Sequence, residues 1–193
     1  MSEKTNKILA VFKKKNALLE GHFLLSSGLH SGQYLQCARV LEDPKLCARL
    51  ARSLAAHFKT KKIDVVIGPA MGGITLAYEL ARALGARALF AEREEGKMCL
   101  RRGFTVRAKE NVVVAEDVIT TGGSVKEVIA ALAPLGARIA GVAALIDRSG
   151  GASVFGKIPF QSLAKVNIKT FSPEQCPLCR QGLPLVKPGS RTR

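Results

Sequence analysis

The chain has 193 residues, 47% of them hydrophobic, with no tryptophan and two tyrosines. This length is expected to give one domain with a substantial core, and no segment approaches the roughly 18 uncharged apolar residues of a membrane span. The net charge is +15, but the basic residues are scattered and form no basic helix or zinc-finger pattern. They therefore predict a solvated surface that steers anionic substrates, with some affinity for polyanions as the alternative.

No signal peptide is expected at the N-terminus, because Lys4, Lys7 and residues 13–15 interrupt every apolar stretch. The chain has five cysteines, an odd number. Without a secretory signal these are expected to be reduced thiols, which predicts a cytoplasmic protein. The lack of an apolar span predicts no membrane partner, and the scattered charge disfavours a nucleic-acid partner.

Amphipathic spacing predicts a helix over residues 5–20, closed by Gly21. Residues 23–36 alternate apolar and small polar side chains, which is typical of a strand or hairpin. Asp43 stands directly before a proline and is expected to cap a helix over residues 44–58.

The middle of the chain repeats a strand–helix pattern. Buried strands are predicted at residues 64–67, 87–91, 112–115 and 139–146, helices at 74–84 and 125–135, and a loop or long hairpin at 92–111. Beyond about Gly150 the pattern is lost, and short strands over one edge are expected. The alternation predicts an α/β fold with a doubly wound, mostly parallel sheet.

The stretch VVVAEDVITTGGS, residues 112–124, carries the strongest chemical signal. Its apolar run predicts a buried strand, so Glu116 and Asp117 are expected at the carboxyl end, where α/β sheets bind ligands. The glycines and hydroxyls that follow offer a cradle for a phosphate. Ser124 and Glu127 form an S-x-x-E capping box, which predicts a helix start whose positive end faces the loop. Because carboxylates accept hydrogen bonds from sugar hydroxyls or hold a metal ion, the stretch predicts a ribose 5-phosphate site.

Three further features follow predicted strands. The turn GPAMGG, residues 68–73, can present amides to an anion, or it is a structural turn. The loop 92–109 is rich in Arg and Lys and is either a lid over a diphosphate or an exposed hairpin, with Arg93 and Lys97 nearest to the strand. Arg148 is either a surface ion-pair partner or a clamp for a carboxylate.

The motif CPLC, with Cys176 and Cys179, offers half of a tetrahedral zinc site. The other half could come from a second subunit, or from Cys37 or Cys47. The alternative is two free thiols in a tail. Thioredoxin-like chemistry is disfavoured, because the motif lacks a helix and a βαβ context.

Residues 112–124 closely resemble the phosphoribosyl-diphosphate signature of type I phosphoribosyltransferases. Further segments resemble the orotate phosphoribosyltransferases among them, in that family's order: FLLSSGLHSGQYLQCARVL (23–41), GPAMGGITLAYELARALG (68–85), AEREEGKMCLRRGF (91–104) and ALIDRSGG (144–151). The resemblance implies one domain over residues 1–193, with a core of about 44–149 and a small hood from about 1–43 and 150–193.

The resemblance also implies a glycosyl-transfer activity. The phosphoribosyl group of 5-phosphoribosyl 1-diphosphate would pass to orotate, giving orotidine 5′-monophosphate and diphosphate, with Mg²⁺ held mainly by the substrates. A homodimer with shared active sites is implied, because the loop with Arg93 and Lys97 reaches the neighbouring subunit in the family. The implied residues are Arg93, Lys97, Glu116, Asp117, Val118, Ile119, Thr120, Thr121, Gly122, Gly123 and Ser124 for phosphoribosyl diphosphate, Ala70, Met71, Gly72 and Gly73 for its diphosphate, Thr120, Arg148 and Ser26 for orotate, and Lys97 and Asp117 for catalysis.

The chain departs from the family pattern on the base side of the site. Many relatives carry a lysine where we align Ser26, an aromatic residue where Leu35 stands, and more basic residues where Glu94 and Cys99 fall. A serine cannot replace the charge of a lysine. His30 is the other polar candidate nearby, or a hydrogen-bonded loop histidine.

Three alternatives therefore stay open. One is a phosphoribosyltransferase for a purine or another base. Another is a non-catalytic sensor of phosphoribosyl diphosphate that binds nucleic acid, and the third is a nucleic-acid-binding protein whose glycine loop is structural. Retention of Arg93 and Lys97 favours an enzyme, since binding alone requires no lid.

Overall fold

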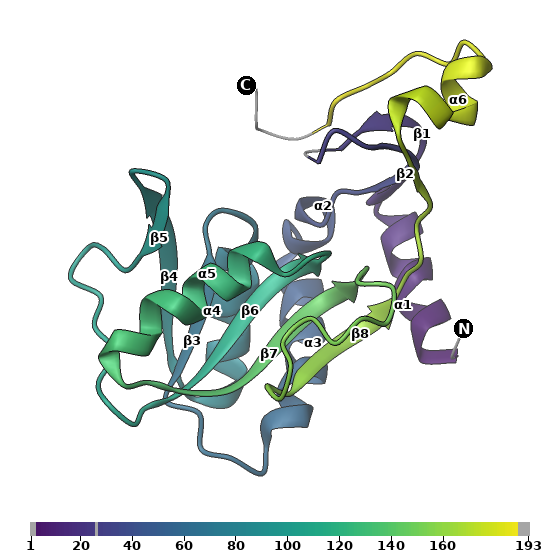
Figure 1. Cartoon of the computed structure of the whole chain (residues 1–193). Coiled ribbons are helices and arrows are strands. Elements are labelled where there is room, and N and C mark those ends of the chain that lie inside the picture. The colour runs from purple at the N-terminus through teal and green to yellow at the C-terminus, as the bar shows by residue number, and fades with distance from the viewer. Residues whose placement is uncertain (1–2, 26, 189–193) are drawn as a thin grey trace.

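The computed structural model describes residues 3–25 and 27–188. Within these residues the main body is a six-stranded sheet, and a three-stranded sheet stands at one end of it (Figure 1). The main sheet has the order β5-β4-β3-β6-β7-β8, with β3 (Val65–Pro69), β4 (Arg87–Glu94), β5 (Lys97–Cys99), β6 (Asn111–Ile119), β7 (Arg138–Asp147) and β8 (Phe160–Lys165). All described neighbours are parallel except β5, which pairs antiparallel with β4.

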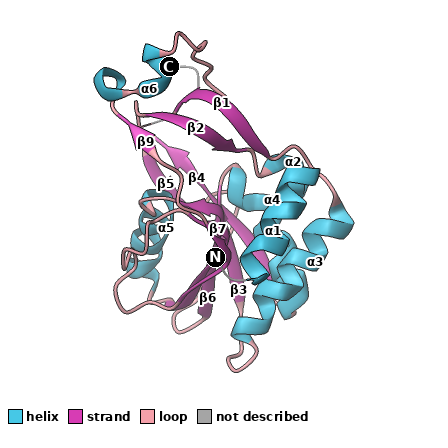
Figure 2. Cartoon of the chain, turned by 90° about the vertical axis from the view of Figure 1, so that its right-hand side faces the viewer, coloured by secondary structure: helices cyan, strands magenta, loops and turns pink. Residues whose placement is uncertain are grey.

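Helices cover both faces of this sheet. The described helices are α1 (Glu3–Lys14), α2 (Ala38–Leu41), α3 (Pro44–Ala55), α4 (Gly72–Leu84), α5 (Gly123–Leu132) and α6 (Pro177–Arg180), with 3-10 turns η1 (Ala56–Phe58), η2 (Ala133–Leu135) and η3 (Pro173–Gln175). Of these, α6 lies beside the smaller sheet and not on the main one (Figure 1, Figure 2). Figure 2 shows α3 and α4 on one side of the sheet and α5 on the other. The predicted doubly wound, mostly parallel α/β sheet is therefore confirmed.

The side chains of β6 show why its sequence is apolar throughout. Val113 and Ala115 join the core beneath α3 and α4, whereas Val112 and Val114 join the core beneath α5. Successive side chains of a strand point to opposite faces, so a central strand covered on both sides needs a continuous apolar run. The strand is longer than predicted and pairs with β7 as far as Ile119.

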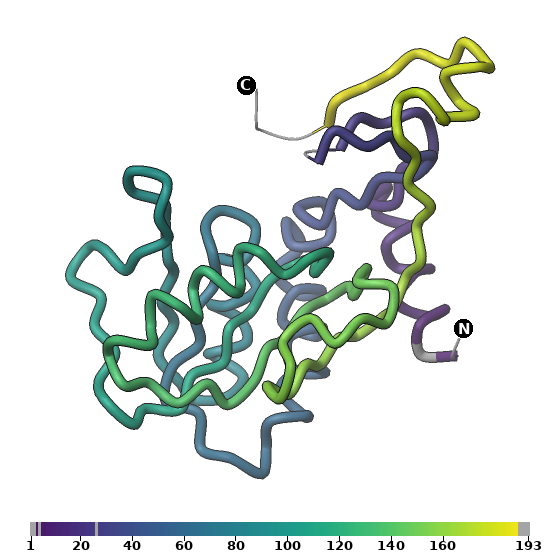
Figure 3. Tube along the Cα trace, viewed as in Figure 1, coloured from purple at the N-terminus to yellow at the C-terminus, as the bar shows by residue number. Residues whose placement is uncertain are grey.

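The smaller sheet, which we call the hood sheet, has the order β1-β2-β9, with β1 (Leu18–Leu24), β2 (His30–Leu35) and β9 (Thr170–Phe171). Segments from the N-terminal and C-terminal parts of the chain lie side by side in this region (Figure 3). Leu24 N–H donates to Val186 O at 2.8 Å, and Val186 N–H donates to His22 O at 2.9 Å. Because β8 extends the main sheet, the expected end of the core at residue 149 was placed too early.

The first helix is shorter than the predicted range 5–20. Asn16 has a φ of 50°, and the amides of Asn16 and Ala17 donate to the carbonyls of Lys13 and Phe12 at 3.0 and 2.8 Å. This is the Schellman arrangement, in which an asparagine in the left-handed region ends a helix. Gly21, the predicted helix stop, lies instead within β1.

Other local predictions are confirmed. The Asp43 carboxylate accepts the Leu46 N–H at 3.1 Å as the cap of α3. Gly85 and Gly136 end α4 and η2 in the left-handed conformation, with φ of 68° at each. The segment 92–111 contains a hairpin formed by β4 and β5. In the described part of the chain no helix is long and apolar enough to cross a membrane.

Candidate active site

A cavity of about 280 Å³ opens where β6 ends and α5 begins. Residues 118–125 line it, together with Arg93, Glu116 and Glu127. It lies at the carboxyl end of the parallel strands, the edge where α/β sheets bind ligands. All predicted phosphoribosyl-diphosphate residues except Asp117 and Lys97 are among the described residues that line it.

Gly122 shapes the turn between β6 and α5. Its φ is 72°, and a Cβ there would lie 2.5 Å from Val154 Cγ1 and 2.8 Å from Phe155 Cε1. A larger residue does not fit here for two reasons: the backbone conformation favours glycine, and a side chain would clash with Val154 and Phe155. The Lys126 Nζ donates to Thr121 O at 3.0 Å and fixes the turn from the helix side. The loop therefore presents its amides to the cavity at the positive end of α5.

The predicted capping box is wrong. The helix α5 begins at Gly123 with Gly122 as its N-cap, so Ser124 lies inside the first turn and caps nothing. Glu127 does not reach back to the helix start, because its carboxylate binds Arg93 instead, with a closest N–O distance of 2.6 Å. The helix start rests on a glycine conformation rather than on a side chain.

Glu116 and Asp117 are adjacent in β6 and face different surroundings. Glu116 lines the cavity, and its Oε1 accepts the Asp117 N–H at 3.2 Å. Asp117 Oδ1 accepts the Val118 N–H at 2.8 Å. Burial raises the pKa of Asp117 above its ordinary value, although the hydrogen bond from the Val118 N–H opposes the shift.

The glycine turn after β3 lies directly against Asp117. A Cβ at Gly72 would stand 3.2 Å from the Asp117 carboxylate, and one at Gly73 would stand 2.7 Å from Ala115 O. The Ala70–Met71 peptide bond in this turn is cis, and Ala70 N–H donates to Ala91 O at 2.7 Å. The structure thus brings the predicted diphosphate loop, residues 70–73, and Asp117 together at one edge.

The predicted lid is a hairpin whose charges are largely paired. The Arg93 guanidinium donates to Gly96 O at 2.8 Å and binds Glu127, so it is fixed at the cavity. Arg101 and Arg102 form ion pairs with Glu94 and Glu92 at 3.2 and 3.0 Å. Lys97 is exposed on β5 and lies outside the lining of the cavity in the described part of the chain.

Arg148 follows β7, and its backbone N–H donates to Ile119 O at 2.7 Å. Its Nε is buried and has no hydrogen-bond partner among the described residues. Burial lowers the pKa of the guanidinium. A buried donor without a partner is costly, so this group is suited to an anionic ligand. Thr120, the other described orotate candidate, is exposed at the cavity, and Ser26 lies outside the described residues.

A family model for the phosphoribosyl transferase domain matches residues 38–172. An orotate phosphoribosyltransferase of Caldicellulosiruptor bescii is 56% identical over 185 residues, which cover 96% of this chain and 97% of the relative. One from Heliobacterium modesticaldum is 55% identical over 190 residues, covering 97% and 98%. The chain belongs to the orotate phosphoribosyltransferase family.

Solved structures of phosphoribosyltransferases share its fold. The orotate phosphoribosyltransferase from Aeropyrum pernix has a TM-score of 0.67 at 28% identity, covering 82% of this chain and 93% of that one. An adenine phosphoribosyltransferase from Thermoanaerobacter pseudethanolicus has a TM-score of 0.62 at 19% identity, covering 69% and 88%. Since proteins named for different bases share the fold, the sequence relatives and not the fold point to orotate.

Sequence reasoning missed two residues, Tyr34 and Cys37, that connect the hood sheet to the site of this family member. Burial raises the pKa of Tyr34, with Asp117 as the next contribution. Burial first, and the charge of Asp117 second, also raise the pKa of Cys37 well above its usual range. Both residues therefore stand near Asp117, and Arg148 acts on both with the opposite sign. The only signal was that one of the two tyrosines of the chain lies in the predicted hairpin.

The CPLC motif lies in the hood region, outside the lining of the cavity. Neither Cys37 nor Cys47 completes it, because both are buried in the core of the main body. Of the two interpretations of His30, the structure favours a hydrogen-bonded histidine over a polar group beside the substrate. His30 is 4% exposed, and its Nδ1 lies 2.9 Å from His22 Nε2.

Proposed function

We propose that this protein transfers the phosphoribosyl group of 5-phosphoribosyl 1-diphosphate to orotate, giving orotidine 5′-monophosphate and diphosphate in pyrimidine nucleotide synthesis. The 56% identity to a curated orotate phosphoribosyltransferase over 96% of the chain carries the proposal. The cavity at the start of α5, lined by the loop that follows β6, supports it independently.

The phosphoribosyl group is proposed to lie along the edge formed by β6 and α5. The amides and hydroxyls of residues 120–124 bind the 5-phosphate. Glu116 and Asp117 accept hydrogen bonds from the ribose hydroxyls. Residues 70–73, beside Asp117, bind the diphosphate.

The base side of the site is proposed to lie near Arg148 and Thr120, where Ser26 is also proposed to contact orotate. The unpartnered Nε of Arg148 supports this position, because orotate carries a carboxylate that a guanidinium binds through charge-assisted hydrogen bonds.

The chemistry requires little covalent participation by the protein. Displacement of diphosphate from the anomeric carbon passes through a state with oxocarbenium character, as in other glycosyl transfers. The Asp117 carboxylate favours positive charge on the ring, and Arg93 and Lys97 stabilise the leaving diphosphate. No side chain acts as a nucleophile; the residues orient the substrates and exclude water.

Mg²⁺ fits the donors at this edge. Glu116 and Asp117 supply carboxylate oxygens, the ligand type that Mg²⁺ prefers. Because glycine stands at position 72, the space against the Asp117 carboxylate stays open, whereas a Cβ would lie 3.2 Å from it. When bound, Mg²⁺ would neutralise charge on the diphosphate. The substrates would supply most of its ligands.

Lys97 supports a homodimer with shared active sites. It is exposed at the hairpin and does not line the cavity of its own chain, among the residues that the structure describes. We propose that it completes the site of a second copy. We also propose that the enzyme acts in the cytoplasm, where its free cysteines stay reduced.

A substrate panel tests the proposed function. Purified protein with Mg²⁺, phosphoribosyl diphosphate and orotate should consume orotate, followed by its ultraviolet absorbance, and Asp117→Asn serves as the inactive control. Turnover with a purine base but not with orotate would overturn the substrate. Failure with every base, together with tight and salt-sensitive RNA binding, would favour the sensor alternative.

A further inference from the structure

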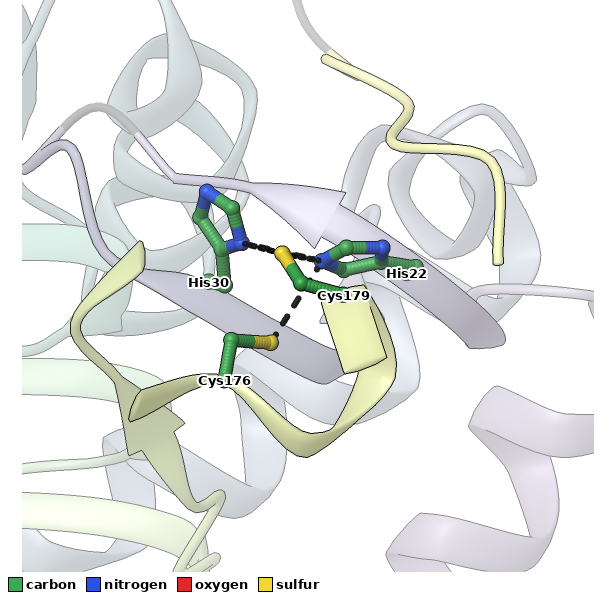
Figure 4. A group of neighbouring side chains, drawn as sticks. All are labelled: His22, His30, Cys176 and Cys179. Atoms are coloured by element: carbon green, nitrogen blue, oxygen red, sulfur yellow. Dashed lines mark hydrogen bonds between the residues drawn. The ribbon is translucent and has the colours of Figure 1, made fainter. Parts of the chain in front are cut away.

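Four metal-ligating side chains converge in the hood region, away from the proposed active site (Figure 4). They are His22 of β1, His30 of β2, Cys176 and Cys179. One ligand atom from each lies within 4.8 Å of all the others. Nothing in the phosphoribosyl transfer uses these residues.

Two of these atoms come from each of two segments that are remote in sequence. The β1–β2 hairpin supplies both histidines, and the segment around α6 supplies both cysteines. Sequence reasoning found only the cysteine half, because the histidines are separated from it by about 150 residues, as in the Cys176–His22 separation of 154.

The sulfur–nitrogen distances match a tetrahedral zinc site, and the two nitrogens lie somewhat closer together than in one. With Zn–S near 2.3 Å and Zn–N near 2.05 Å, tetrahedral angles place two nitrogens about 3.4 Å apart and a nitrogen and a sulfur about 3.6 Å apart. The two imidazole nitrogens are 2.9 Å apart. The sulfur atoms of Cys176 and Cys179 lie 3.5 and 3.7 Å from His22 Nε2, and the sulfur of Cys179 lies 3.3 Å from His30 Nδ1.

One histidine already has the partner that a metal ligand needs on its other nitrogen. His22 Nδ1 lies 2.8 Å from Leu183 O. A carbonyl can only accept, so Nδ1 carries the proton and Nε2 presents its lone pair to the cluster. A backbone carbonyl in this position orients many zinc-bound histidines.

The C-terminal segment needs such an attachment, because it has almost no core of its own. Of residues 172–188, only Cys176 is buried. Leu183, Leu185 and Val186 are 43%, 44% and 51% exposed. Small layers that bury little apolar surface commonly depend on a structural metal.

We propose that His22, His30, Cys176 and Cys179 bind one structural Zn²⁺ ion, which clamps the C-terminal segment to the β1–β2 hairpin. Two thiolates and two imidazoles are a set that selects zinc among common divalent ions. Four protein ligands leave no open position for substrate, so the ion stabilises and does not catalyse. On binding, each thiol loses its proton to solvent, while the imidazoles bind as neutral ligands.

The clamp lies at one end of β2 and the active site at the other. His30 is the first residue of β2, and Tyr34, which stands near Asp117, is four residues further along. At about 3.3 Å per residue this is roughly 13 Å. The ion would therefore hold the hood sheet in place without touching the substrates.

Metal content of the full-length protein tests the proposal, whether or not the enzyme turns over orotate. Protein purified without a histidine tag or chelator should contain about one zinc per chain by plasma mass spectrometry. Cys179→Ser should lose the zinc. Cys99→Ser and His57→Asn are the matched controls, since both residues lie outside the cluster, and these variants should keep it.

Two measurements on the unmodified chain cover the case in which the cluster variants fail to fold. A strong chelator should lower the Tm, and added Zn²⁺ should restore it. Co²⁺ added to the zinc-free protein should give the visible bands of tetrahedral coordination and a near-ultraviolet thiolate charge-transfer band.

Three results would overturn the clamp. The first is wild-type protein with less than about a tenth of an equivalent of zinc and no Co²⁺ bands on titration. The second is full zinc retention by both Cys179→Ser and His22→Asn. The third is a Cys176–Cys179 disulfide in the protein as isolated, seen as a loss of two hydrogens in its mass, which would make the motif a redox pair.

Discussion

At the scale of single residues, the candidate active site holds charges that folding alone does not favour. Burial raises the pKa of Asp117 and lowers that of Arg148, so each charged form is costly in the free protein. The Nε of Arg148 lacks a partner among the described residues. Such groups are retained where a ligand supplies the missing interactions, which is why perturbed residues gather at functional sites.

Replacing Arg148 with glutamine should raise the KM for orotate by about 10- to 100-fold, the worth of one or two hydrogen bonds to a charged group. The KM for phosphoribosyl diphosphate should change much less. Initial-rate kinetics with each substrate varied will check this. Arg138→Gln is the control, because Arg138 is exposed at the opposite end of the same strand. Equal losses for both substrates would contradict a role on the base side.

At the scale of elements, strand ends and helix starts place the site, and short contacts between elements hold it. The glycine turn before α4 packs against Asp117 of β6, and Arg93 of β4 binds Glu127 of α5. At the edge of the main body, Lys15 after α1 binds Asp43, the cap of α3, at 2.8 Å. This ion pair connects the helix that leads into the hood sheet with a helix of the core.

Asp43→Ala should lower the Tm at pH 7 by about 2–4 °C, because it removes both the helix cap and the Lys15 ion pair. Asp43→Asn should cost less, since its amide oxygen still accepts the Leu46 N–H. Thermal unfolding of both variants across pH will check this.

The pH dependence of the Asp43 effect has a defined sign. The Lys15 hydrogen bond, more than any other contact, lowers the pKa of Asp43 in the folded state. The stabilisation that the Asp43 carboxylate gives is therefore complete at pH values above its unfolded pKa of about 3.9. It disappears as the pH falls through the folded pKa. A wild-type advantage over Asp43→Asn that grows towards acid pH would contradict the ion pair.

At the scale of the whole molecule, the chain is built so that its two ends form the hood sheet over a site carried by the middle. Segments from both termini meet through β1, β2 and β9, and the proposed zinc would fasten them. The net charge of +15 favours the approach of anionic substrates to the chain. In a single chain, Lys97 is exposed on its hairpin.

Complementation between inactive variants tests whether Lys97 serves a second copy. Lys97→Ala and Asp117→Asn chains, coexpressed with different tags and purified through both, form mixed dimers. If Lys97 acts across the interface, one site of each mixed dimer is intact, and turnover should return to about half of wild type per dimer. Each variant alone should remain nearly inactive. Inactive mixed dimers, or a monomer by sedimentation, would refute the shared site.

Local spacing determined much of this protein. The apolar run of β6, the proline and aspartate before α3, and the glycines after α4 and η2 act through contacts a few residues apart, and the structure confirms them. The turn between β6 and α5 was likewise predictable, because a strand, two glycines and a helix start follow one another directly in the chain.

Contacts between distant segments were decided only by the tertiary structure. Glu127 looked like half of a capping box but binds Arg93, and α1 ends at Lys14 because Asn16 adopts a left-handed conformation. The charge of Asp117 acts on Tyr34, and His22 and His30 meet the CPLC cysteines, only once the sheets are packed. A motif records neighbours along the chain, whereas ligand sets and pKa shifts depend on which side chains packing brings within a few ångströms.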